Sequence, residues 1–398
     1  MTSCLQKFRL TWSKCRNGHP WCQGARRTRE DGASGHIPDG PTGTLATWVA
    51  RMTLDDVPAP TRERARHLIL DGIGCALVGA KLPDSRKGFE GITALDDSGS
   101  AEIIGWGGLT TSALSAAMLN SSFIQGFEMD DFRPTAPLHS NSVVLPAMLG
   151  AGLAATGYVG IKRVFERAYG GCLAVFGEGH QPDATQISAN LGSFWETDRI
   201  TVKAYSAMGL LHAAIDAALE LRTEGVTPDD VVSIDIDMPQ AAYRHGGWKA
   251  ERPLTPIGAQ MNVAYAVAVA LLDGKVLIDQ FTADRIAGAD VWNLIDRTMT
   301  RHEAKYDELP VTQRLTTRVA ATLKDGSVRD KTVVHPRGSG DRLLTNDEIV
   351  EKYRDLTRTV VSAERQSAIE SAILGLEDMA DISELVALLT PTVRAATD

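Results

Sequence analysis

The sequence has no apolar run close to the ~20 residues that a membrane-spanning helix requires, so we expect no membrane partner. It has only five cysteines in 398 residues, too few and too scattered for a disulfide framework, which fits a reducing compartment. It contains no internal repeat and no glycine-rich phosphate loop. The net charge of −9 argues against a nucleic-acid partner, although a site for a small anion needs only local positive charge.

The composition is that of a soluble globular protein, with 43% hydrophobic and 23% charged residues. The length is enough for two or three domains and for a large core. A possible metal cluster, formed by Cys15, His19 and Cys22, matches no standard zinc spacing, so we predict no metal there.

The first 29 residues contain seven lysines or arginines and no acidic residue, a charge pattern that resembles a mitochondrial presequence. They are poor in serine and leucine, however, and carry Trp12, Trp21 and three cysteines. The alternative is a disordered tail that takes no part in the fold. We favour that alternative and expect a cytoplasmic protein; an intact Met1 in the mature chain would exclude the presequence.

Hydrophobic periodicity predicts helices towards both ends of the chain and a mixture of strands and helices between them. Strands are indicated by the alternation in Val231–Met238 and by an Asp325-Gly326 turn between two apolar runs. The predicted helices include Leu45–Arg51, Thr61–Val78, Thr111–Phe127, Gly209–Leu221, Gln260–Leu272, Asn346–Leu376 and Ile382–Leu389. This order predicts an α+β fold, in which an all-α helical domain formed by both chain ends carries an inserted smaller α+β domain.

The domain boundaries follow from the changes in composition. A segment rich in glycine and proline ends near Gly43 and reads as a linker. We therefore assign residues 1–43 to an N-terminal extension, residues 44–192 and 341–398 to the helical domain, and residues 193–340 to the α+β domain.

The segment Glu128–His139 places three carboxylates, Arg133 and a histidine at a break between two apolar helical patterns. Charge is too costly to keep in a core without a use, so this segment is the candidate site. Asp130 and Asp131 either orient a histidine or carry a proton, because adjacent carboxylates raise one another's pKa; the alternative is helix capping. His139 is either a general acid and base or the cap of the helix that follows.

Several motifs of this chain resemble those of the MmgE/PrpD family, which includes 2-methylcitrate dehydratases and cis-aconitate decarboxylases. The resemblance covers about Thr44 to Leu389 and follows the family's order. The motifs are Leu70–Ala76, the acidic segment through Ser140, Val144–Ala147, Lys203–Tyr205, Gly209–Ala218, Gln260–Ala268, Val319–Gly326 and Asn346–Arg354. Ala136–Ser140, His245–Trp248 and Glu251–Pro253 are most similar to the fungal aconitate-decarboxylase-like branch.

The resemblance implies a helical domain and an α+β domain with a catalytic cleft between them, no metal, no cofactor and a homodimer. It implies catalytic roles for Asp130, Asp131 and His139, and for His212 from the other domain. His212 lies on an apolar helical pattern, where a core histidine is equally expected.

Candidate binding residues follow from the chemistry of a tricarboxylate. Arg133, Lys203 and Arg252 are the cations that we expect to hold carboxylates. His245 lies in a Gly-Gly-Trp segment that either closes over a site or forms a structural turn.

The chain departs from the family after about Gly152. The family's helical stretch with further active-site groups is absent, and a junction with four glycines in residues 150–160 stands in its place. Either the gene model misses an exon or the deletion is real.

We therefore predict a metal-independent lyase for a small-molecule tricarboxylate of the citrate or aconitate type. Dehydration of an alkylcitrate, as in 2-methylcitrate dehydratases, stands slightly ahead of decarboxylation of cis-aconitate. Both reactions need a proton carrier poised near neutral pH and cations for three carboxylates. The third alternative is a catalytically impaired relative.

Overall fold

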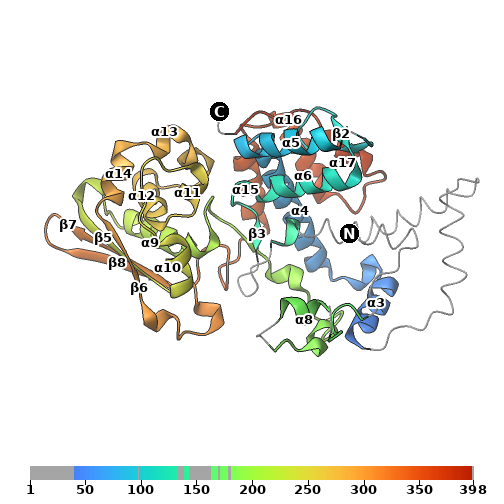
Figure 1. Cartoon of the computed structure of the whole chain (residues 1–398), viewed down its shortest axis with the longest axis horizontal. Helices are drawn as coiled ribbons and strands as arrows, with labels where there is room; N and C mark the ends of the chain where they lie inside the picture. The colour runs from blue at the N-terminus through green and yellow to red at the C-terminus, as the bar shows by residue number, and fades with distance from the viewer. Residues whose placement is uncertain are drawn as a thin grey trace, which may run out of the picture. The chain divides into compact units, whose positions relative to one another are not determined.

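The computed structural model describes residues 40–96, 98–132, 139–142, 163–168, 171–177 and 181–396, and the fold is α+β (Figure 1). The expectations for residues 1–39, for Arg133 and for the glycine-rich junction lie outside these residues. The chain forms two compact units, residues 1–65 with 144–198 and residues 66–143 with 199–398. In the described parts of the chain, no helix is long and apolar enough to cross a membrane.

The first unit is built from short elements joined by side chains. It contains α3 (Pro41–Arg51), the start of α4 (Ala59–Gly79), α8 (Cys172–Phe176) and 3-10 turns. Thr42 on α3 donates a hydrogen bond to Glu166, and Trp48 packs on Trp195 with ring centroids 5.7 Å apart.

The helical part of the second unit combines segments from early and late in the chain. Small residues on α4 permit close approach: Gly74 lies against the ring of Tyr353, and Gly79 lies against the backbone of Phe123. A side chain at Gly79 would clash with that backbone, so the absence of a side chain here is what permits the close approach. The helices around α4 are α5 (Pro83–Leu95), α6 (Ala113–Gln125), α15 (Asn346–Thr357), α16 (Ala363–Leu374) and α17 (Ser383–Leu389).

The α+β part of the second unit contains a four-stranded sheet in the order β6-β5-β7-β8. These strands are β5 (Val231–Met238), β6 (Thr298–His302), β7 (Thr317–Leu323) and β8 (Val328–Val333). Strand β5 pairs parallel with β6 and antiparallel with β7, and β7 forms a hairpin with β8 through Gly326 at φ +82°. The strand and hairpin predicted from alternation and the Asp-Gly turn are confirmed.

Two helices, α9 (His212–Thr223) and α12 (Val263–Asp273), pack on this sheet (Figure 1). The β5 side chains Ile234, Ile236 and Met238 are fully buried, because alternate residues of a strand point to the same face. Helix α12 is apolar on all sides and ends at Gly274, whose left-handed conformation closes the helix. The remaining helices of this part are α10 (Gln240–Gly246), α11 (Pro256–Gln260), α13 (Ala283–Ile286) and α14 (Ala289–Ile295).

One predicted helix is divided in two. Residues 346–376 form α15 and α16 because Ser362 starts a new helix by accepting a hydrogen bond from the backbone N–H of Arg365. Helix α5 was not predicted, since Gly88 and Gly91 weaken its helical signal.

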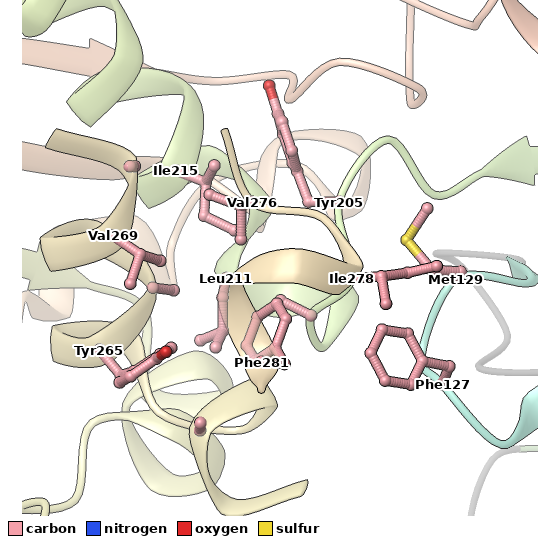
Figure 2. Close-up of a cluster of buried hydrophobic side chains, with 14 of the residues drawn as sticks. Phe127, Met129, Tyr205, Leu211, Ile215, Tyr265, Val269, Val276, Ile278 and Phe281 are labelled. Carbon is pink, nitrogen blue, oxygen red and sulfur yellow. The ribbon is translucent and has the colours of Figure 1, made fainter. Parts of the chain in front are cut away.

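The chain directly after α6 packs on the core of the α+β part. Figure 2 shows Phe127 and Met129 beside Ile278 and Phe281. Phe127 meets Phe281 edge to face, with ring centroids 6.2 Å apart, and Gln260 donates a hydrogen bond to the Phe127 carbonyl at 2.9 Å. The acidic segment is therefore anchored directly before its first carboxylate.

Candidate active site

A short antiparallel pairing brings the acidic segment to a distant lysine. Strand β3 (Asp131–Phe132) pairs with β4 (Thr201–Val202), so that Asp131 lies opposite Val202. Lys203 follows directly after β4 and consequently reaches the carboxylates that precede β3. Its side chain is only 2% exposed.

Lys203 is the central cation of the site. Its Nζ atom lies 2.7 Å from Oε2 of Glu128 and 3.2 Å from Oδ1 of Asp130. An ammonium group has three donors, so these two acceptors leave one N–H for a further partner. Lys203 was expected to bind substrate; the structure shows it paired with two acids, the partly buried Glu128 and the fully buried Asp130.

His139 and Asp130 form the second contact of the cluster. Nδ1 of His139 lies 2.7 Å from Oδ2 of Asp130, whose side chain is fully buried. Because a carboxylate oxygen accepts, Nδ1 donates, and Nε2 remains the nitrogen that can exchange a proton with a substrate. The hydrogen bond and charge of Asp130 raise the pKa of His139 above its usual value, although partial burial opposes the rise. With 26% of its side chain exposed, His139 is the accessible member of the pair.

Asp131 has a different environment from Asp130. Its Oδ1 accepts a hydrogen bond from the backbone N–H of Asn141 at 3.0 Å, while its Oδ2 is buried without a hydrogen bond from any described residue. Burial raises the pKa of Asp131 to about 6, and the charge of Asp71 acts in the same direction. Asp131 therefore both caps the turn after His139 and titrates near neutral pH.

His212 lies in the core at the start of α9, with 1% of its surface exposed. Its Nε2 donates a hydrogen bond to the Ala207 carbonyl at 3.1 Å, and its ring meets Tyr205 edge to face at 5.2 Å. Burial, assisted by the charge of Lys203, lowers the pKa of His212 to about 3. His212 is thus a neutral imidazole at physiological pH, and the field of Lys203 reaches both histidines.

The remaining predicted binding residues lie on other elements. Arg252 is exposed and stacks over the ring of Trp292 at 4.5 Å. His245 is exposed on α10, while its neighbour Gly246 packs against Leu211, the residue before His212. Among the described side chains, neither residue forms a hydrogen bond or ion pair with the acidic segment, and Arg133 lies outside those side chains.

Sequence reasoning gave Glu128 no role, yet this residue is the nearest acceptor of Lys203. Its backbone is also unusual, because φ is +54° at a residue that is not glycine. The one sequence feature that could have indicated this role is the position of Glu128 as the first acid of the acidic segment. Across the described ranges, no group of three histidine, cysteine or acidic side chains is arranged to hold a metal.

A cavity of about 320 Å³ opens beside Ala204 and Lys352. Its wall is highly charged, but Arg337 pairs with Glu348 at 2.8 Å and Arg358 pairs with Asp279 at 3.3 Å. Since these arginines already have acidic partners, the cavity is not the clearest place for a tricarboxylate.

Comparison with known proteins identifies relatives along most of the chain. The MmgE/PrpD N-terminal domain matches residues 43–152, and the MmgE/PrpD C-terminal domain matches residues 205–378. The cis-aconitate decarboxylase-like protein oryM of Aspergillus oryzae is 30% identical over 88% of this chain and 97% of the relative. A cis-aconitate decarboxylase of Aspergillus terreus is 28% identical over 91% and 98%, and one of Homo sapiens is 24% identical over 64% and 53%.

The alignment with oryM also contains many positions that have no residue in this chain. The alignment with oryM spans 473 positions, and 88% of 398 residues is about 350, so about 120 positions of the alignment are gaps in this chain. The N-terminal domain match ends at residue 152, where the predicted internal deletion begins. The matched domains and the relatives show that this chain belongs to the MmgE/PrpD family.

Proposed function

We propose that this chain acts as a lyase on a citrate- or aconitate-type tricarboxylic acid, with decarboxylation of cis-aconitate as its reaction. The observation that carries the proposal is the contact between His139 Nδ1 and Asp130 Oδ2 at 2.7 Å, which leaves Nε2 free for proton transfer. The names of the fungal relatives support decarboxylation over the dehydration that the family's base rate favours.

The chemistry requires one bond cleavage and one proton transfer. The bond between carbon and the departing carboxylate breaks, carbon dioxide leaves, and the electron pair remains on the carbon skeleton as an allylic carbanion. Protonated His139 delivers a proton from Nε2 to that skeleton. Asp130 holds the ring in the required orientation and stabilises its charged form, as a carboxylate behind an imidazole does.

Cations would hold the remaining carboxylates of the substrate. The third N–H of Lys203 is available for one of them, and Arg133 follows β3 directly in the sequence. His212 acts as a neutral core residue in this proposal, and His245 and Arg252 stay candidate binding residues. The domain boundaries, the homodimer and independence from a metal also remain proposals.

Dehydration of an alkylcitrate is the second candidate, and the raised pKa of Asp131 favours it. Loss of hydroxide needs both an acid and a base, and a carboxyl with a pKa of about 6 in the same segment as His139 supplies a second proton carrier. A third possibility is a catalytically impaired relative. About 120 positions of the alignment with oryM, which spans 473 positions, are gaps in this chain, because 88% of its 398 residues is about 350.

The test incubates the purified full chain with cis-aconitate and, separately, with 2-methylcitrate. We expect carbon dioxide from cis-aconitate and no new unsaturated acid from 2-methylcitrate. The reverse result would select dehydration. Turnover of neither acid would contradict both lyase proposals for this chain and favour the impaired relative. Sequencing the transcript across the codons for residues 150–160 then distinguishes a missed exon from a real deletion.

A further inference from the structure

A second buried lysine contacts the acidic segment. Nζ of Lys352, on α15, lies 2.6 Å from Oδ1 of Asp71, on α4, and the two side chains are 8% and 0% exposed. The same ammonium donates a hydrogen bond to the backbone carbonyl of Met129. Met129 is the residue between Glu128 and Asp130, so Lys352 is bound to the backbone that carries the candidate site.

Burying this ion pair costs desolvation free energy, which an apolar contact at the same place would avoid. Removing an ammonium from water is expensive, and an apolar pair of similar size is often equally stable in such a position. Burial acts to lower the pKa of Lys352, but the charges of Asp71 and Asp130 outweigh it and raise the pKa overall. The lysine therefore remains charged beside the site.

The backbone of the acidic segment needs such a restraint. The φ angle of Glu128 is +54°, a left-handed conformation that is strained for a non-glycine residue and persists only where the surroundings impose it. Lys203 holds the Glu128 side chain at 2.7 Å, while Lys352 holds the next carbonyl along the chain. Together the two lysines restrain this strained position, Lys203 through the Glu128 side chain and Lys352 through the backbone of the next residue.

We propose that Lys352, held by Asp71, is a positioning residue that sets the Met129 carbonyl and thereby presents Asp130 to His139. The contacts of Lys352 that carry this role are those with Asp71 and with the Met129 carbonyl, so its effect on His139 runs through the backbone. The role in turnover rests on the proposed lyase function, but the geometric role does not. Neither residue was given a site role by the sequence, because α4 and α15 are far apart along the chain.

A double-mutant comparison separates positioning from simple charge pairing. Lys352→Met and Asp71→Leu each leave one buried charge alone, whereas the double variant replaces the pair with apolar groups. We expect both single variants to lower the melting temperature and the double variant to recover it. We expect kcat of the double variant to stay about 10–100-fold below that of the parent, as for losses of supporting contacts at other sites. Recovery of kcat together with the melting temperature would overturn the proposal.

A readout that does not need turnover keeps this test distinct from the function test. The imidazole of His139 is titrated by NMR in the parent and in the double variant, with His139→Gln to assign the signal. We expect the raised pKa of His139 to fall towards its ordinary value in the double variant, because Asp130 is no longer held against the ring. Identical titrations would refute the proposal even if the parent turns over neither acid. Lys324→Met, at the exposed hairpin turn, is the matched control.

Discussion

Nζ of Lys203 lies 2.7 Å from Oε2 of Glu128, although 75 positions separate the two residues in the sequence. The pairing of β3 with β4 produces this contact, since it places the chain after β4 beside the carboxylates before β3. The lysine thus compensates the first acid of the segment and Asp130 together. The positive charge of Lys203 offsets the cost of removing these carboxylates from water.

Lys203→Met should destabilise the protein, because it leaves Glu128 and Asp130 without their shared cation. Breaking a buried ion pair by removing one partner costs about 3 kcal/mol or more. The free energy of unfolding, measured by chemical denaturation, should recover in part when Glu128→Gln is added. An equal loss in the single and the double variant would show that Lys203 contributes through packing and not through charge.

Asp131→Asn should stabilise the protein above pH 6. The pKa of Asp131 is raised to about 6 in the folded state, so the folded protein holds this proton more tightly than the unfolded chain. Stability from this group is therefore present at low pH and is lost as the pH rises from about 4 to 6. The asparagine oxygen can still accept from Asn141, and the gain at pH 7.5 should approach about 2–3 kcal/mol. A gain that is the same at pH 4 and pH 7.5 would contradict this account.

His139→Gln should lower kcat for cis-aconitate by about 10²–10⁴-fold, the usual contribution of a proton carrier. If His139 donates the proton, the activity of the parent falls as the pH rises through the raised pKa of this histidine. That alkaline decline should be absent from the residual activity of the variant. His302→Gln is the control, because His302 forms another histidine–aspartate pair, with Asp307, on the exposed strand β6. A pH profile that instead falls towards acid would indicate a base, as dehydration requires.

His212 should make the fold sensitive to acid. Its pKa is lowered to about 3 in the folded state, so the unfolded chain takes up this proton first as the pH falls below about 6.5. The associated stability is complete above pH 6.5 and decreases below it, by about 2 kcal/mol at pH 5. His212→Asn should show a shallower decrease in unfolding free energy between pH 6.5 and pH 5. Parallel curves for the parent and the variant would exclude His212 as the cause.

The local elements were largely predictable because their signals are local. Val231–Met238 alternates in burial as its sequence alternates, and Gly326 adopts the left-handed conformation that an Asp-Gly turn requires. The cluster of charges in Glu128–His139 marked the candidate site for the same reason, since all its members are neighbours in sequence. Periodicity also gave the α+β class, which the structure confirms.

The contacts between distant residues required the tertiary structure. No local pattern indicates that Lys203 pairs with Glu128, or that Lys352 and Asp71 meet under the Met129 carbonyl. The sequence by itself determined which side chains are ionisable and which short segments form helices and strands. Only the packed fold decided which charges are compensated and which histidine remains open to solvent, because burial and the distances between charges set their protonation.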